Sequence, residues 1–538
     1  MNIIILLDSP TISQAKANDP FASSTGALLR RLIQSCPPGP TPTILYLFPT
    51  PRTASPFLTK TAAGKLPHST HFQNAYTTAP VEAAVKALHE KLASLPPSII
   101  ITMGDYALWS LTSFTSSSKY RGSFLTPYAA PSPSRLIPTY SLSNLQKMFS
   151  WFPVALSDFR KAWNQSLSLS PEPIWDFLIA PSYTEALSAI LSLRTKLDTS
   201  LSPLPIAIDI ETRGKQIACI GFASSPTSAF CIPLMSATSP SGYWTEEEEE
   251  QIILALRQVL SHPSLHIIGQ NFLYDAQYIL AQFLLFLPPH DDTMIAQGVL
   301  FPGTEKNLAF LASMYCDFYT YWKDDGRKWE PSMGEKQLWQ YNCLDCCRTW
   351  EIMEKIRPFL SRANLTEQYQ FVLDMCRPIL TTTARGVLIN TKKRDAFASS
   401  LLIQMEEIAA RLSTFFPPLS PPPKNASPRY NSPIQLARIL YDELGLEPVR
   451  KKKPPFSRTT DDPALQIISK REPLLSPILS LLAEYRSVGV FFSTFIQAKL
   501  GPASRIHCSY NPVGTETLRL NSYSDSFDEG TNLQNIPT

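Results

Sequence analysis

Two carboxylates, Asp209 and Glu211, lie inside an apolar run that alternates like a buried strand. Side chains two residues apart in a strand point to the same face, so both carboxylates are predicted to lie together. Like charges beside a core are costly unless a cation lies between them. The pair therefore indicates a divalent metal site, although a strand end that emerges into solvent is the simpler explanation for an isolated pair.

Two further polar pairs follow this strand at helical spacing. Asn271 and Asp275 are four residues apart after the apolar run 266–269, and Tyr341 and Asp345 have the same separation later in the chain. Residues four apart share one face of a helix, and the first pair is predicted near a helix start. Each pair alone is more simply a helix cap or a surface pair. Together, in this order, they favour one acidic site, and hard oxygen ligands suit Mg²⁺ or Mn²⁺.

The order of these residues resembles the three exonuclease motifs in the proofreading domain of family A DNA polymerases, in the subclass with a tyrosine and four acidic residues. Stretches that begin at Asp292, Pro302 and Asn307 are similar to sequences between the second and third motifs of phage enzymes, while Gln270 stands where many relatives have histidine. The resemblance implies an RNase H-like mixed sheet and a 3′→5′ exonuclease. It also implies two Mg²⁺ or Mn²⁺ ions that clamp the attacking and leaving oxygens of a phosphodiester.

The resemblance also implies a role for each residue of the acidic site. Asp209, Glu211 and Asp345 are expected to bind the ion that activates water. Asp209 and Asp275 are expected to help place the second ion, and Tyr341 is expected to orient the attacking water. Loss of any metal-binding carboxylate should be severe, because electrostatic stabilisation carries most of the catalysis.

The rest of the chain resembles the thumb and the beginning of the palm of the same polymerases. The resemblance lies in an ordered series of segments, from 385–390 through 431–446, 459–461 and 484–500 to 514–522 and 532–537. Leu518 and Asn521 stand where relatives usually have glycine, which permits close backbone approach, and serine. The residues expected to contact DNA are Asn271, Arg450, Lys451, Lys452, Lys453, Thr459, Arg519, Asn532 and Gln534. A merely solvated loop explains the basic run 450–453 equally well.

In the polymerase family that this chain resembles, the metal-binding aspartates of the palm and the helix of the fingers come after the position of Pro537. In this sequence, one residue follows Pro537. We therefore expect that this chain alone does not extend a primer. A second polypeptide, or a missing portion that carries palm and fingers, should complete the polymerase site. A split gene, an intron, an intein and a truncation are the alternatives.

The first 165 residues resemble a uracil-DNA glycosylase in segments 19–29, 99–107, 138–140 and 158–162. The run from Asp8 to Pro10 replaces the catalytic loop of that family, and Ser141 stands in place of a histidine of its second motif. We therefore expect a glycosylase-like fold without glycosylase activity that positions DNA. An α/β domain without this ancestry is the alternative.

Length and composition indicate an α/β multidomain protein. The chain has 538 residues, of which 44% are apolar and 17% charged, as in folded globular domains. We expect a glycosylase-like domain over 1–165, a linker over 166–174, the exonuclease over 175–360, a mainly helical thumb over 361–504 and an incomplete palm over 505–538. The net charge of +3 does not demand a nucleic-acid partner, so DNA binding depends on local patches.

Cysteine spacing and the N-terminus bear on the cellular setting. Cys343, Cys346 and Cys347 contain one C-x-x-C spacing without a second pair, so packing thiols in a reducing cytoplasm are favoured over zinc. The apolar run 3–7 is too short for a signal peptide or a membrane span. We expect a cytoplasmic protein without a membrane partner, encoded by a virus of a bacterial host.

Two functional hypotheses follow. In the first, the chain is the front part of a DNA polymerase for replication that proofreads, with a primer–template and a single-stranded DNA 3′ end as its partners. In the second, it is a non-catalytic subunit that holds DNA for a separate catalytic chain. The complete set of acidic and tyrosine residues favours the first hypothesis, because a site that no longer binds metal has no need to keep them.

Overall fold

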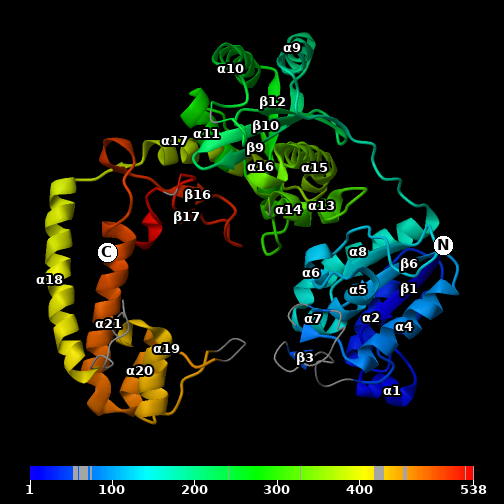
Figure 1. Ribbon diagram of the computed structural model, residues 1–538, viewed down its shortest axis with the longest axis horizontal. Coiled ribbons are helices and arrows are strands. Elements are labelled where there is room, and N and C mark those ends of the chain that lie inside the picture. Colours follow the sequence, from blue (N-terminus) through cyan, green and yellow to red (C-terminus); the bar gives the residue numbers. More distant parts are fainter. Residues whose placement is uncertain are drawn as a thin grey trace. The chain divides into compact units, whose positions relative to one another are not determined.

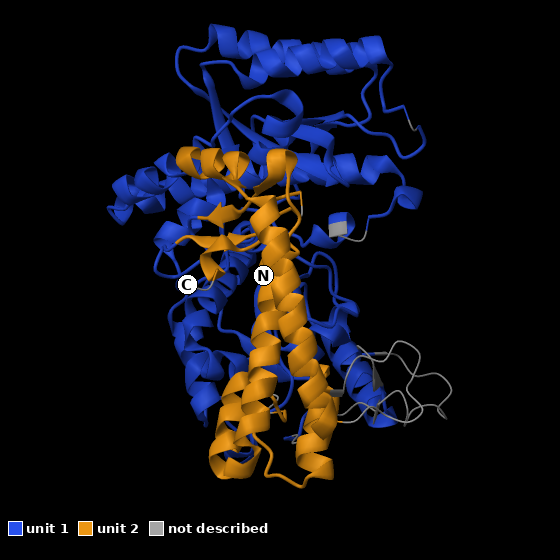
Figure 2. Cartoon of the chain, turned by 90° about the vertical axis from the view of Figure 1, so that its left-hand side faces the viewer, with its two compact units in different colours: residues 1–376, 512–519 blue, residues 377–511, 520–538 orange. Residues whose placement is uncertain are grey.

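The structure is a computed structural model, and it describes residues 1–51, 58–59, 71–72, 75–239, 241–327, 329–416, 429–451, 457–527 and 529–536. Helices and sheets follow one another along the chain (Figure 1), which confirms the α/β multidomain class. The chain divides into two compact units (Figure 2). Met1–Cys376 with Pro512–Arg519 form the first unit, and Arg377–Asn511 with Leu520–Thr538 form the second. The first unit thus contains both the glycosylase-like and the exonuclease domains.

The N-terminal domain is built on a four-stranded parallel sheet. Its strands lie in the order β2 (Thr43–Tyr46), β1 (Asn2–Leu7), β6 (Ser98–Met103) and β7 (Arg135–Thr139). The helices α2 (Ser24–Gln34), α4 (Ala79–Ala93), α5 (Asp105–Thr112) and α8 (Phe152–Leu167) accompany this sheet. A parallel sheet covered on both faces needs apolar residues at successive positions, and β1 and β6 are such runs.

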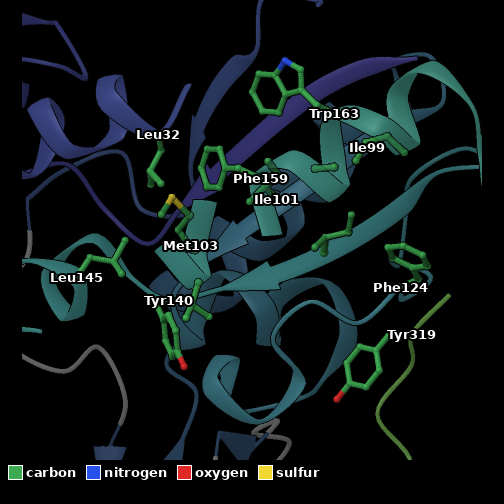
Figure 3. Close-up of a cluster of buried hydrophobic side chains, with 14 of the residues drawn as sticks. Leu32, Ile99, Ile101, Met103, Phe124, Tyr140, Leu145, Phe159, Trp163 and Tyr319 are labelled. Carbon is green, nitrogen blue, oxygen red and sulfur yellow. The ribbon is translucent and has the colours of Figure 1, made fainter. Parts of the chain in front are cut away.

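Alternate residues of the central strands enter two separate cores. Ile5 and Ile101 belong to a core that contains Phe159 and Trp163 of α8 (Figure 3). Their neighbours in sequence, such as Ile100, belong to a second core with residues of α4 and α5. Because side chains alternate across a strand, a continuous apolar run supplies both cores at once.

The expected linker over 166–174 is wrong at its first two residues. The helix α8 continues to Leu167, and Ser166 is buried in its last turn. The Ser166 hydroxyl donates a hydrogen bond to the Trp163 carbonyl (2.7 Å), and the N-terminal amine of Met1 donates to the Ser166 carbonyl (2.6 Å). Serine indicated a linker, but its hydroxyl can bond back to the preceding helical turn and so remain in the helix.

The exonuclease domain is built on a six-stranded mixed sheet. Its strands lie in the order β13 (Asp291–Asp292), β12 (Leu265–Gly269), β9 (Leu204–Arg213), β10 (Gln216–Ala223), β11 (Ser228–Pro233) and β8 (Asp176–Leu178). The strand β10 is antiparallel to β9 and β11, whereas β12 is parallel to β9 and β13. The mixed sheet implied by the family resemblance is therefore present.

Helices cover both sides of this sheet, and the helix on one side carries residues of the acidic site. The helices α9 (Tyr183–Thr199) and α10 (Glu246–Leu260) pack against each other, and Figure 1 shows them above the sheet with α15 (Glu335–Arg362) below it. The helix α15 contacts β9, β10 and β11 and carries the last motif of the site. It continues two residues past the domain end expected at 360. The short helices α11 (Leu273–Phe283), α12 (Thr293–Leu300), α13 (Leu308–Tyr315) and α14 (Lys323–Arg327) complete the domain.

The second unit is mainly helical and ends in short strands, in the order predicted from the sequence. The long helices α18 (Thr391–Phe415) and α21 (Ser476–Phe491) pack together, with α19 (Pro433–Ala437) and α20 (Asp462–Arg471) around one apolar core. The strands β14 (Val387–Leu388) and β15 (Arg505–Ile506) pair, as do β16 (Ser509–Asn511) and β17 (Asn521–Tyr523). Among the described residues, one helical stretch, Pro473–Ile496, is long and apolar enough to cross a membrane, and its mean hydropathy is 1.3.

Asp8 occupies the end of β1, where a glycosylase would have its catalytic loop. Its Oδ1 accepts a hydrogen bond from the Ala107 N–H (2.8 Å). A Cβ on Gly104, whose φ is 124°, would lie 2.4 Å from Asp8 Oδ2. Burial raises the pKa of Asp8 to about 7. The hydrogen bond from Ala107 lowers this pKa, and the charge of Asp105 raises it further.

We expect Asp8 to make this protein less stable as the pH rises from about 4 to about 7, because the folded state keeps a proton that the unfolded chain releases. Asp8→Asn keeps the acceptor for Ala107 without the charge, so its melting temperature should exceed that of the wild type at high pH and match it at low pH. Thermal unfolding across this pH range measures the difference. The exposed variant Glu90→Gln should follow the wild type, and an identical pH dependence for Asp8→Asn would contradict the expectation.

Candidate active site

The strand β9 and the helix α15 bring three carboxylates together. Asp209 and Glu211 lie opposite Gly221 and Cys219 of β10, and their same-face placement is as predicted. One oxygen each from Asp209, Glu211 and Asp345 lie within 4.8 Å of one another. Among the described residues this is the group that could hold a metal ion with three protein ligands.

Close packing of α15 on the sheet depends on the missing side chain of Gly221. A Cβ at Gly221 would lie 2.2 Å from Asn342 Oδ1 and 2.8 Å from Cys346 Sγ. Because α15 comes so close, Asn342 Nδ2 can donate to Asp209 Oδ2 (2.9 Å) and to its carbonyl (3.1 Å). The site predicted from the sequence did not include Asn342. The one indication in the sequence was its polar side chain, next to Tyr341 on an otherwise apolar face of the helix.

Asp275 joins the site through the backbone of β9. It lies in the first turn of α11, as predicted, and its Oδ1 accepts a hydrogen bond from the Ile210 N–H (2.9 Å). Asn271 was predicted to share a helical face with Asp275, and this is wrong. Asn271 precedes the helix with φ 59°, and its carbonyl accepts from the Tyr274 N–H (3.0 Å). The chain must turn sharply from β12 into α11, and asparagine tolerates the left-handed conformation that this turn requires.

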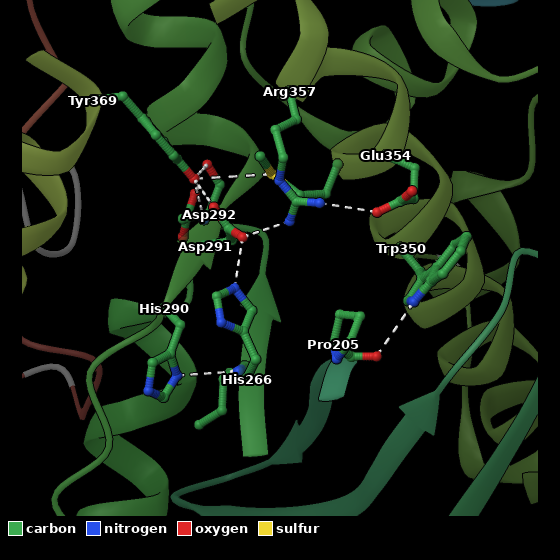
Figure 4. Close-up of polar contacts among 11 residues, drawn as sticks. Pro205, His266, His290, Asp291, Asp292, Trp350, Glu354, Arg357 and Tyr369 are labelled. Atoms are coloured by element: carbon green, nitrogen blue, oxygen red, sulfur yellow. Dashed lines mark hydrogen bonds and ion pairs between the residues drawn. The ribbon is translucent and has the colours of Figure 1, made fainter. Parts of the chain in front are cut away.

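A second buried acidic pair lies beside the site and has a structural task (Figure 4). Asp292 accepts hydrogen bonds from the first turn of α12 and, through Oδ2, from the Phe272 N–H (2.8 Å). Asp291 has partners on three other elements: His266 (2.7 Å), Arg357 (2.7 Å) and Tyr369 (2.8 Å). The pair ties β13, the β12–α11 turn and α15 together, and so fixes the turn that presents Asp275.

Burial and mutual repulsion disfavour the charged forms of the site carboxylates. Burial and the charge of Asp345 raise the pKa of Asp209 to about 7. Burial and Asp209 likewise raise the pKa of Glu211 and of Asp275 well above the ordinary range. A cation among these oxygens would reverse the effect. The donor set therefore fits a hard divalent cation.

The segment around α14 delivers two further side chains that the sequence did not mark. Lys323 Nζ donates hydrogen bonds to the Tyr341 hydroxyl (2.7 Å) and to Asp345 Oδ2. Trp322 Nε1 donates to Asp345 Oδ1 (2.6 Å). A Cβ on Gly326 would lie 2.6 Å from the Tyr341 ring, so glycine lets α14 close over this ring. The predicted pairing of Tyr341 and Asp345 on one helical face is confirmed by their shared contact with Lys323.

Most of the residues predicted to contact DNA belong to the second unit. Arg450 and Lys451 are exposed. The Lys451 N–H donates to the Ser457 carbonyl (2.9 Å), and the Thr459 N–H donates to the Val449 carbonyl (2.9 Å). Lys452 and Lys453 lie outside the described residues. For these positions, contact with DNA stays a prediction.

The remaining predicted DNA contacts lie near the end of the chain. Asn532 Oδ1 accepts hydrogen bonds from the Ser522 hydroxyl (2.5 Å) and the Gln534 N–H (3.0 Å), so this side chain already has partners within the protein. Arg519 and Gln534 are exposed. Leu518 has φ 57°, a left-handed conformation that glycine adopts without strain. This conformation accounts for the glycine that resembling sequences usually have there.

Comparison with protein families matches three successive parts of the chain. Residues 1–167 match the uracil DNA glycosylase superfamily, 182–361 match the 3′-5′ exonuclease family, and 424–538 match DNA polymerase family A. The chain thus carries a 3′-5′ exonuclease domain followed by a segment that is similar to family A DNA polymerases. All five predicted residues of the acidic site lie within the exonuclease match.

Individual relatives agree with these family matches. DNA polymerase I of Synechocystis sp. is 29% identical over 261 residues, which cover 46% of this chain and 24% of the relative. The thermostable DNA polymerase I of Thermus aquaticus is 32% identical over 257 residues, which cover 47% of this chain and 27% of the relative. The chain therefore spans about a quarter of the length of these curated relatives. A solved structure of the POL domain of Pol1 from M. smegmatis, in complex with DNA primer-template and dNTP, covers 68% of this chain and 56% of its own at 20% identity and a TM-score of 0.47.

We expect Asp275→Asn to separate the charge of this residue from its structural bond. Asparagine keeps the acceptor for the Ile210 N–H but removes a buried carboxylate whose charged form is disfavoured. In EDTA at alkaline pH the variant should therefore melt no lower than the wild type, while Mn²⁺ should stabilise it less. Thermal unfolding across a Mn²⁺ series measures both effects. Asp374→Asn, an exposed change, should match the wild type in each, and a variant that melts lower in EDTA would contradict the expectation.

Proposed function

We propose that this chain removes nucleotides from the 3′ end of single-stranded DNA and proofreads for a replicative polymerase in the cytoplasm of a virus-infected bacterium. The observation that carries this proposal is the convergence of Asp209, Glu211 and Asp345 within 4.8 Å, inside a 3′-5′ exonuclease domain. Tyr341 lies on the same helix as Asp345. Asp275 accepts a hydrogen bond from the Ile210 N–H, which lies between Asp209 and Glu211 in β9. All five residues of the tyrosine-bearing, four-carboxylate type are therefore in or next to one site.

The chain's own residues can hold two Mg²⁺ or Mn²⁺ ions and position the reacting groups. Asp209, Glu211 and Asp345 would bind one ion, and Asp209 with Asp275 would help place the other. Such ions supply an activated water and neutralise charge that develops on the phosphodiester. Burial and Asp345 raise the pKa of Tyr341, so its hydroxyl stays protonated and can orient the attacking water. Asn342 keeps Asp209 in place through its two hydrogen bonds.

We expect the purified chain to shorten a 5′-labelled single-stranded oligonucleotide when Mg²⁺ or Mn²⁺ is present. Asp209→Ala should lower the rate by more than about a hundredfold, because it removes a ligand and leaves transition-state charge unneutralised. Tyr341→Phe should cause a smaller loss, since it removes water orientation but no ligand. Product lengths over time, with Asp374→Ala as the control, measure these rates. An oligonucleotide left intact at saturating metal would sink the proposal.

The second unit supports a proposal about the primer–template duplex. Residues 424–538 match family A polymerases, and the exposed Arg450 and Lys451 lie in this unit and could contact phosphates. We propose that the unit binds the duplex while a second polypeptide supplies the palm and the fingers. An apolar cavity of about 730 Å³ near β14 and β15 supports such a partner, and its lining includes Val387, Phe397, Phe495, Ile506, Leu533 and Ile536. Exposed apolar surface of this kind is typical of an interface with another chain.

We expect a polypeptide that carries a palm and fingers to bind the second unit. Co-expression with a polypeptide that begins at the first aspartate motif of a palm should give a complex that extends a primer. Val387→Asp, at the cavity, should weaken co-purification, because a charge then faces apolar surface. Ile434→Asp, an exposed apolar position elsewhere in the unit, is the control. Primer extension by this chain alone would refute the proposal that a second polypeptide supplies the palm and the fingers.

We propose that the glycosylase-like domain does not excise uracil. Ser141 uses its hydroxyl as the N-cap of helix α7 (Leu142–Lys147), where it accepts from the Asn144 N–H (3.2 Å). Asp8 lies half-buried against Gly104, and its Oδ1 accepts a hydrogen bond from the Ala107 N–H. Neither residue is arranged as a free catalytic group.

A uracil-containing duplex incubated with the protein should therefore yield no free uracil. Detection of the released base by mass spectrometry is the measurement, with a catalytically active glycosylase as the positive control. Uracil release that a Ser141→Ala or Asp8→Ala change abolishes would show that the domain is an enzyme.

A further inference from the structure

Residues 319–324 of the exonuclease domain run along the glycosylase-like domain. The Phe124 N–H donates a hydrogen bond to the Tyr319 carbonyl (2.7 Å), and the Tyr321 N–H donates to the Ser123 hydroxyl (3.2 Å). Tyr319 is buried, and Figure 3 shows it in the same core as Phe124. The segment is therefore held by the neighbouring domain through its backbone as well as its side chains.

Side chains reinforce this attachment at the end that leads into α14. Lys119 forms an ion pair with Asp324 (2.5 Å), and the rings of Tyr120 and Tyr321 meet edge to face with centroids 5.3 Å apart. Asp324 directly follows Lys323 in the chain. A residue of the glycosylase-like domain thus holds the position next to the lysine of the acidic site.

A buried charged cluster fixes the interface nearby. Arg121 and Asp158 form an ion pair (2.6 Å) with side-chain exposures of 3% and 0%. Thr139 donates to the second oxygen of Asp158 (2.7 Å), and Arg121 donates to the hydroxyl of Ser313 in the exonuclease domain. Buried ions are stable only with good geometry and full hydrogen bonding, so this cluster sets one arrangement of the two domains.

On its other side, the segment occupies the acidic site. Lys323 contacts Tyr341 and Asp345, and Trp322 contacts the other oxygen of Asp345. Asp345 is also one of the three carboxylates that could share a metal ion. An ammonium and a divalent ion cannot both neutralise the same carboxylate at full strength, because they repel each other.

We propose that the glycosylase-like domain is a positioning element of the exonuclease: through residues 319–324 it holds the Lys323 ammonium against Asp345 and Tyr341, in competition with the metal ion. This inference rests on the proposed exonuclease function. Lys323 orients the Tyr341 hydroxyl and lowers the repulsion among the carboxylates before metal binds. Lys323 also lines a polar cavity of about 210 Å³, together with residues of both domains. Glu305 lines the same cavity and offers the ammonium another carboxylate when the metal ion binds Asp345.

Manganese affinity without DNA tests the competition directly. Lys323→Ala should bind Mn²⁺ several-fold more tightly than the wild type, by calorimetry or by electron paramagnetic resonance of free Mn²⁺, while kcat of the exonuclease falls. Lys323→Arg should bring both values back toward the wild type. Lys355 lies on the same helix as Tyr341 and forms an exposed ion pair with Asp317 (2.8 Å), so Lys355→Ala should change neither value. A merely structural lysine would instead give weaker metal binding together with lower activity, and that result overturns the inference.

Variation on the glycosylase-like side tests the positioning role. Lys119→Ala should shift Mn²⁺ affinity in the same direction as Lys323→Ala but less, and adding it to Lys323→Ala should produce no further change, because both act through one segment. Wild-type metal affinity in Lys119→Ala would refute the domain's role. These outcomes concern metal affinity. The exonuclease proposal instead fails if the wild-type chain leaves the oligonucleotide intact or if the Asp209→Ala protein degrades DNA like the wild type, so the two failures are distinguishable.

Discussion

The crowding of negative charge between β9 and α15 is the constraint on which the rest of the first unit depends. Asp209, Glu211 and Asp345 present oxygens within 4.8 Å of one another beside an apolar sheet, where water can screen them only weakly. Such a group is unstable without positive partners, as the raised pKa values of Asp209 and Glu211 show. The fold meets this cost with hydrogen bonds from Asn342 and Trp322 and with the Lys323 ammonium.

Holding these charges requires rigid surroundings that lie outside the site itself. Gly221 lets α15 come close to β10, and Gly326 lets α14 close on Tyr341. Asp292 fixes the turn before Asp275 through the Phe272 N–H, and Asp291 ties the same strand to β12 and α15. Because each of these contacts joins elements that are distant in sequence, small changes at one of them are transmitted to the position of a carboxylate.

The glycosylase-like domain takes on a different meaning in this setting. Ser141 serves as a helix cap, and Asp8 is a half-buried carboxyl that bonds to the Ala107 N–H. Its face against residues 313–324 is well developed, with a buried ion pair, backbone hydrogen bonds and an edge-to-face ring pair. We propose that this domain serves through the geometry that it imposes on its neighbour rather than through a reaction of its own.

The sequence by itself determined the strand that carries Asp209 and Glu211, their placement on one face and the pairing of Tyr341 with Asp345, because these depend on local periodicity. It could not show that Asn271 leaves the helix, that α8 continues into the expected linker, or that Lys323 and Asn342 enter the site. Those features depend on close approach between distant segments, and on the hydrogen bonds that buried polar groups must then find. Only the tertiary structure, in which a neighbouring domain holds residues 319–324 in place, decided which cation lies among the carboxylates.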